Sequence, residues 1–184
     1  MKTCLIALFL CAASWLPQAM AATPTDDEKD FQLYRKAADQ GNAIAQWNLG
    51  VFYADGRGVP MDEAEAVKWF RKVADQGFAA AQFKLGILYE EGRGVPKNAA
   101  EAMKWFRKAA DQGYADAQYN LGVMYADGRG VPKDETEAYK WYLLAGAQGL
   151  DYAKSSISSI ERKIKPAQKA EGQRRATEWK PQKP

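Results

Sequence analysis

The sequence predicts an all-α fold, a solenoid in which helix–loop–helix units stack in a row. Three motifs predict it, because each occurs three times at a spacing of 36 residues. They are Ala-Gln-x-x-Leu-Gly at 45–50, 81–86 and 117–122, Gly-Arg-Gly-Val-Pro at 56–60, 92–96 and 128–132, and a segment from Trp to Gln-Gly at 69–77, 105–113 and 141–149. Repetition at this period is typical of solenoids, whose units bury their apolar sides only against their neighbours.

Residues 1–22 are expected to be a secretory signal peptide. Lys2 precedes an apolar run over 4–16, and Ala19-Met20-Ala21-Ala22 offers small residues for cleavage. The run is shorter than the ~20 residues of a membrane-spanning helix, and an uncleaved anchor or a buried helix is the alternative. We therefore expect a periplasmic or secreted protein with no transmembrane segment after cleavage.

Both cysteines, Cys4 and Cys11, fall in that segment, and the sequence contains no histidine. The mature chain is expected to be held together by packing without disulfides. The mature chain thus offers neither histidine nor cysteine as a ligand, so we predict no metal site. No glycine-rich phosphate loop follows a strand, so we predict no cofactor.

The repeat places a helical solenoid over residues 23–164, in four parts. A capping helix is expected at about 26–40, three full repeats at 41–148 and a partial fourth at 149–164. First helices are predicted over 42–55, 78–91 and 114–127, and second helices over 63–76, 99–112 and 135–148. Apolar residues at helical spacing support both, for example Ala45, Leu49 and Phe52 in the first.

The boundaries of these helices carry recurring signals. Asp62, Asn98 and Asp134 stand at N-cap positions, each followed three residues later by Glu, which predicts capping boxes. Gly77, Gly113 and Gly149 follow the second helices, where a left-handed residue is favoured. Gly50, Gly86 and Gly122 lie inside the first helices at a cost of ~1 kcal/mol each relative to alanine, which predicts a close helix crossing there.

Both ends of the array depart from the repeat. In the N-terminal capping helix, Leu33 and Tyr34 occupy the positions that Trp69 and Phe70 occupy in the first repeat. Over 150–164 we expect four side chains to face inward, those of Tyr152, Ala153, Ile157 and Ile160. Residues 165–184 are expected to form a C-terminal capping helix, about 166–179, and a basic tail whose end, about 180–184, is disordered.

The third unit carries Leu143-Leu144 where the others carry Arg-Lys. An apolar pair at a position that is otherwise charged is expected to be covered. The C-terminal helix, through Trp179, is the favoured cover, and a dimer contact is the alternative. We therefore expect a monomer rather than a dimer.

The combined pattern resembles the Sel-one-like repeat, a branch of the tetratricopeptide-like superfamily. The resemblance rests on A-x-A-Q-x-x-L-G-x-x-Y, G-x-G-V-P, an acidic cap and A-x-K-W-(F/Y)-x-K-A-A-x-Q-G, and it covers about residues 31–164. It implies a right-handed α/α superhelix that acts as an adaptor, in exported bacterial members for envelope processes or host contact. One cysteine-rich subgroup is linked to penicillin binding and β-lactam hydrolysis, but its paired cysteines are absent from this mature chain.

By the same similarity, the first helices line a concave groove. The predicted partner-binding residues flank the Leu-Gly pairs and form an aromatic row beside a polar row: Trp47, Asn48, Phe83, Lys84, Tyr119 and Asn120. Aromatic rings supply contact area, and amide and ammonium groups supply donors for a peptide backbone or carboxylate. The aromatic residues could instead pack between repeats. Positions Asn42/Phe78/Tyr114 and Ile44/Ala80/Asp116 vary most between units, which suits a specific ligand.

Two further rows favour structural roles. Trp69, Trp105 and Trp141 lie beside alanines on an apolar stripe and are expected in the core. Arg57, Arg93 and Arg129 are expected to pair with Asp55, Glu91 and Asp127.

The leading functional hypothesis is a non-catalytic envelope adaptor that holds a partner protein or an extended peptide in its groove, with no nucleic-acid partner. The first alternative is a hydrolase acting on cell-wall or β-lactam substrates, which would rely on Ser, Lys, Tyr or carboxylate chemistry. The second is binding of envelope polymer or lipid through the tail, because residues 161–184 hold eight Lys or Arg and three Asp or Glu.

Overall fold

The computed structural model describes residues 25–182, and the predicted signal peptide lies outside them. Within this range the chain is all-α, with no strand. The helices are α1 (Asp26–Asp39), α2 (Ala43–Asp55), α3 (Glu63–Asp75), α4 (Ala79–Glu91), α5 (Ala99–Asp111), α6 (Ala115–Asp127), α7 (Glu135–Ala147), α8 (Asp151–Glu161) and α9 (Pro166–Glu178). These bounds agree closely with the predicted helices, except that α8 ends three residues early.

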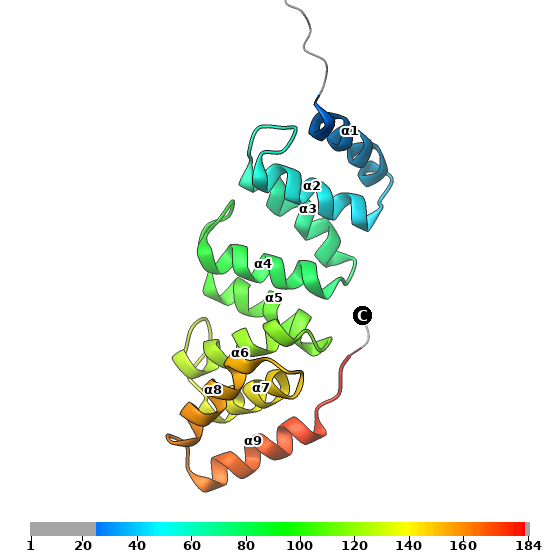
Figure 1. Ribbon diagram of the computed structural model, residues 1–184. Coiled ribbons are helices and arrows are strands. Elements are labelled where there is room, and N and C mark those ends of the chain that lie inside the picture. Colours follow the sequence, from blue (N-terminus) through cyan, green and yellow to red (C-terminus); the bar gives the residue numbers. More distant parts are fainter. Residues whose placement is uncertain (1–24, 183–184) are drawn as a thin grey trace, which may run out of the picture.

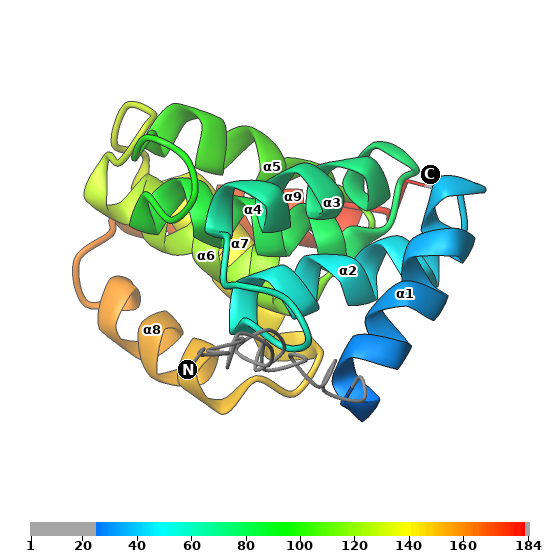
Figure 2. The ribbon, with the colours of Figure 1, turned by 90° about the horizontal axis from the view of Figure 1, so that it is seen from above.

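The helices stack pairwise in a row, as Figure 1 shows from α1 at one end to α9 at the other. The pairs α2–α3, α4–α5 and α6–α7 are the three predicted repeats. Figure 2 looks along the row and shows α3 and α5 along one side, with α2, α4 and α6 nearer the side flanked by α1 and α8. The fold is the predicted all-α superhelical solenoid.

The second helices begin at the predicted caps. Asp62, Asn98 and Asp134 each accept a hydrogen bond from the backbone N–H three residues later, at 3.0 to 3.1 Å. The capping boxes, however, were a wrong prediction. Glu65, Glu101 and Glu137 bind the lysine three residues further on, because an ion pair within the helix competes for the carboxylate that a capping box needs.

The glycines inside the first helices lie under aromatic rings of the paired helix. A Cβ atom at Gly50 would lie 2.6 Å from the Phe70 ring, and one at Gly86 would lie 2.4 Å from the Phe106 ring. At Gly122 the corresponding distance to Tyr142 is 2.5 Å. The predicted close crossing is therefore confirmed in all three repeats.

Each tryptophan of the second helices connects its repeat to the preceding one. Trp69 packs with residues of α1 and α2, Trp105 with α3 and α4, and Trp141 with α5 and α6. All three are at most 5% exposed, which confirms the core prediction. Leu33, at the same position in α1, is 68% exposed, because no earlier helix pair exists among residues 25–182 to receive it.

A ladder of buried glutamines connects the repeats through hydrogen bonds that the sequence analysis did not anticipate. Gln82 is 5% exposed, and its amide donates to the Ala74 carbonyl, which lies near the end of α3, at 3.1 Å. Its side-chain oxygen accepts from Gln112 at 2.8 Å. The pairs Gln76–Gln46 and Gln148–Gln118, at 2.7 Å, repeat this contact on either side. The Gln of each Ala-Gln motif is thus buried and connects neighbouring repeats through hydrogen bonds.

The C-terminal helix covers the last repeat, as predicted. The Trp179 ring lies edge-on to Trp141 with centroids 6.4 Å apart, and it packs with Leu144 in the same apolar cluster. The expectation of a disordered end is wrong for 180–182, because the Gln182 N–H donates to the Asp111 carbonyl at 2.7 Å. Tyr152 also departs from its predicted inward position and is 44% exposed.

Candidate protein-interaction face

The six predicted partner-binding residues lie at equivalent positions in the middle of three successive first helices. Trp47 and Asn48 come from α2, Phe83 and Lys84 from α4, and Tyr119 and Asn120 from α6. All six are half-buried. We call the surface that these helices share the first-helix face.

Each aromatic residue of this row packs partly against its own repeat. Ring centroids lie 5.0 Å apart for Trp47 and Phe70, 5.7 Å for Phe83 and Phe106, and 5.6 Å for Tyr119 and Tyr142. All three aromatic residues therefore contribute to packing, which the sequence analysis gave as the alternative to a binding role. Their binding role depends on what remains open beside them.

In the second and third repeats, a ring from the following repeat covers the aromatic residue. Tyr114 lies 5.1 Å from Phe83, and Tyr152 lies 4.5 Å from Tyr119 in an edge-to-face arrangement. The Tyr152 hydroxyl also donates to Asp116. Burial and this hydrogen bond raise the pKa of Tyr152 to about 12, so the hydroxyl remains a donor at physiological pH.

At Trp47 an apolar hollow of about 170 Å³ stays open between α2 and α4. Its lining is entirely aliphatic and aromatic, from Ala43, Ile44, Trp47, Val73, Phe78, Ala80 and Ala81. Ile44 is 72% exposed and Phe78 is 50% exposed. Both belong to the positions that vary most between units. We call this hollow the Trp47 hollow.

The polar row supplies groups that the fold does not use. Among residues 25–182, the side chains of Asn48, Lys84 and Asn120 make no hydrogen bond or ion pair. The Lys84 ammonium lies 5.8 Å from the centre of the Phe70 ring, which is the ring that also packs on Trp47. The Lys84 ammonium, which makes no ion pair, thus lies over a ring that contacts Trp47.

The arginine row pairs differently from the prediction. Arg57 binds Asp27 at 2.7 Å and Arg93 binds Glu63 at 2.8 Å, both in the preceding repeat or cap. Arg129 binds Glu90 of α4 and keeps the predicted Asp127 at 3.4 Å. Arg93 likewise keeps Glu91 at 3.6 Å. The prediction considered only neighbours in sequence, whereas stacking brings carboxylates of the previous unit within reach.

The basic tail is less free than its composition indicates. Arg175 binds Glu137 of α7, and Lys169 binds Glu161 at 2.9 Å. Arg174 and Arg175 both bind Glu171, and these hydrogen bonds lower the pKa of that carboxyl to about 2. Much of the positive charge of α9 is therefore used to dock and stabilise the helix.

Residues 25–182 contain neither a cluster of metal ligands nor a membrane-spanning helix. No group of three or more His, Cys, Asp or Glu residues there could hold a metal ion. No helix in that part is long and apolar enough to cross a membrane.

Comparison with known proteins identifies the repeat. The family model described as "Sel1 repeat" matches residues 21–42, 43–78, 79–114 and 115–150. The chain belongs to the Sel1 repeat family. Sel1 repeat proteins are generally protein-interaction scaffolds and are typically non-enzymatic, and the fold is suited to protein partners.

Solved structures agree with this family. A Sel1 repeat protein from Oxalobacter formigenes is 42% identical, with a TM-score of 0.69 over 72% of this chain and 54% of that one. The protein c5321, a protective antigen of uropathogenic Escherichia coli strains displaying an SLR fold, is 36% identical, with a TM-score of 0.73 over 81% of this chain and 32% of that one. The Sel1 repeat chain thus spans about half and about a third of these two proteins.

Helicobacter pylori cysteine rich protein B shares the fold at 24% identity, with a TM-score of 0.56 over 73% of this chain and 97% of that one. A search of curated proteins finds no significant match.

Proposed function

We propose that this Sel1 repeat chain is an exported, non-catalytic adaptor that holds a segment of a partner protein on its first-helix face. The Trp47 hollow carries the proposal. It is an open apolar surface where the equivalent aromatic residues of the next repeats are covered by Tyr114 and Tyr152. Filling such a site with one apolar side chain contributes about 1.5–3 kcal/mol.

The polar row supports the same role. Asn48, Lys84 and Asn120 continue along the face at one per repeat and offer amide and ammonium donors. A partner segment with an apolar anchor at Trp47 and a carboxylate near Lys84 would match both rows. The pattern of residues 1–22 supports export, and periplasmic or secreted location is part of the proposal, as is a monomeric state.

A variant that adds a charge at the hollow tests this role. Envelope proteins captured by the tagged chain would be identified, and the affinity of the purified partner would then be measured for Ile44→Glu. Because this change places a carboxylate at the rim of the apolar hollow, we expect at least tenfold weaker binding. Lys84→Glu is expected to weaken the same partner by reversing the charge beside it.

Leu33→Glu is the matched control, since Leu33 is an equally exposed aliphatic residue on α1. It should leave the affinity unchanged, and circular dichroism should show all three variants folded. Unchanged affinity in Ile44→Glu would refute the assignment of the Trp47 hollow.

A further inference from the structure

The joint between the last two helix pairs differs from the two joints before it at three equivalent positions. Tyr142 carries a hydroxyl that its counterparts Phe70 and Phe106 lack, whereas Tyr34 of α1 carries one at the same position. Ser159 stands where α4 and α6 carry Ile87 and Val123. Lys163 stands where the earlier units carry Asp55, Glu91 and Asp127. The three changes together make this joint smaller in side-chain volume, more polar and more positive.

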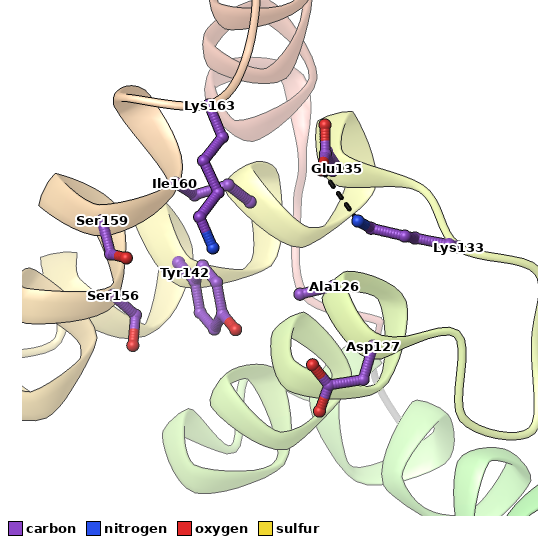
Figure 3. A pocket seen from close by; sticks show the side chains of 9 residues that line it. All are labelled: Ala126, Asp127, Lys133, Glu135, Tyr142, Ser156, Ser159, Ile160 and Lys163. Atoms are coloured by element: carbon purple, nitrogen blue, oxygen red, sulfur yellow. Dashed lines mark ion pairs between the residues drawn. The ribbon is translucent and has the colours of Figure 1, made fainter.

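The result is a hollow of about 180 Å³ between α6, α7 and α8, drawn in Figure 3. Ser156 and Ser159 line it from α8, Asp127 from the end of α6, and Tyr142 from α7. The Lys163 side chain also lines the hollow. Since one water needs roughly 10–15 Å³ of such space, the hollow can take a ligand group of several non-hydrogen atoms.

The hydroxyl groups of the hollow are not used by the fold. Tyr142 is only 6% exposed, and its phenol oxygen faces the hollow. Within residues 25–182, neither this hydroxyl nor those of Ser156 and Ser159 make a hydrogen bond. None of these three oxygen atoms is cut off from solvent, so all three hydroxyls can donate to a ligand that enters the hollow.

Two carboxylates and two ammonium groups line the hollow, those of Asp127, Glu135, Lys133 and Lys163, and Arg129, which also binds Glu90, lies nearby. Asp127 pairs with Arg129 at 3.4 Å, and Glu135 pairs with Lys133 at 3.0 Å. Lys163 makes no ion pair in the part of the chain that the structure describes. One unpaired ammonium group therefore stands with three hydroxyl donors.

We infer that this hollow binds the carboxylate group of a ligand, with Lys163 as its counter-ion and the hydroxyls of Tyr142, Ser156 and Ser159 as hydrogen-bond donors. Charge-assisted hydrogen bonds to a carboxylate are about twice as strong as neutral ones. Burial raises the pKa of Tyr142, so its hydroxyl keeps its proton for donation. The carboxylate can belong to the C-terminus of a peptide or to a free small acid. The site shares no residue with the Trp47 hollow and does not depend on the proposed adaptor role.

An NMR titration of the full chain tests the inference with three probes: N-acetyl-dialanine with a free carboxylate, the same peptide as its amide, and acetate. The free-acid peptide or acetate should shift the amide signals of Ser159 and Lys163, and the amide peptide should bind at least tenfold more weakly than the free acid. Binding of the free-acid peptide alone identifies a peptide terminus as the ligand. Equal binding of acetate identifies a free carboxylate.

Two substitutions locate the site. Lys163→Glu should weaken binding at least tenfold, whereas Lys154→Glu, the same change within α8, should not alter it. Tyr142→Phe introduces the residue type of Phe70 and Phe106, so it should keep the fold and weaken binding several-fold. Equal shifts with acid and amide peptides, no shifts with either acid, or full binding by Lys163→Glu would each overturn the inference.

Discussion

At the scale of single residues, three glycines decide how closely two helices approach. Helix propensity alone favours alanine over glycine by ~1 kcal/mol. The Phe106 ring, however, lies where a Cβ atom on Gly86 would stand. The contact and the propensity therefore act in opposite directions, and the distance indicates that the contact dominates.

We expect Gly86→Ala to lower the free energy of unfolding by about 1–3 kcal/mol, because overpacking a filled joint forces the ring or the helix to move. Urea denaturation followed by circular dichroism measures the change. Ala100→Gly, at an exposed position of α5, calibrates propensity alone. A Gly86→Ala variant more stable than the parent would show that the joint can relax.

At the scale of helices, the glutamine ladder fixes the spacing of successive pairs. Each buried Gln satisfies a carbonyl near the end of one second helix and accepts from a Gln after the next. These bonds are directional, so they specify the stacking geometry in a way that the apolar contacts around them do not.

Gln82→Met keeps the volume of the side chain but removes both hydrogen bonds. We expect the free energy of unfolding to fall by about 1–3 kcal/mol, because the buried Ala74 carbonyl and the Gln112 amide each lose a partner. Thermal and urea unfolding check this. Gln32→Met, on the exposed side of α1, should have little effect, and equal stability of the two variants would contradict a structural ladder.

The helices could be predicted from the sequence because caps, terminal glycines and apolar spacing are local signals. Contacts between repeats could be predicted only in part. The period identified the Trp and Gly rows, but it did not show that Arg57 reaches Asp27 or that Gln46 is buried. Those contacts depend on how far each helix pair is shifted relative to the neighbouring helix pair, and no local sequence pattern determines that shift.

For the candidate sites too, local positions could be predicted from the sequence, whereas contacts between repeats could not. Trp47, Asn48, Lys84 and their equivalents could be placed on one face from spacing alone. The Trp47 hollow and the Tyr142 hollow could not, because a cavity depends on which neighbouring rings happen to cover the space. Comparing the repeats with one another did contain a signal, since Tyr142, Ser159 and Lys163 all depart from their counterparts.

At the scale of the whole molecule, α9 terminates the array. It covers Trp141 and Leu144, and the counterparts of Leu144 in the earlier repeats are the lysines Lys72 and Lys108. Arg175 fixes it to Glu137 of α7. A solenoid of this kind needs such an end, because each unit otherwise presents an apolar side to solvent.

Removal of residues 165–184 is expected to cause self-association and to lower the unfolding temperature, because the apolar side of α7 becomes exposed. Sedimentation velocity and thermal unfolding measure the two effects. Trp179→Ala keeps α9 and should produce a smaller loss of stability. A truncated chain that stays monomeric with unchanged unfolding would show that α9 is not the cover.

The contact of each tryptophan with the preceding repeat has a consequence for how such a protein can change in length. Every internal joint uses the same Trp, Gly and Gln positions on both of its sides. A duplicated 36-residue segment would bring along both halves of a joint and would fit between existing ones without any new packing solution. The central repeats could therefore be exchanged for one another. The Trp47 hollow and the Tyr142 hollow lie near opposite ends of the array. Inserted repeats would therefore change the distance between the two hollows while leaving each of them intact.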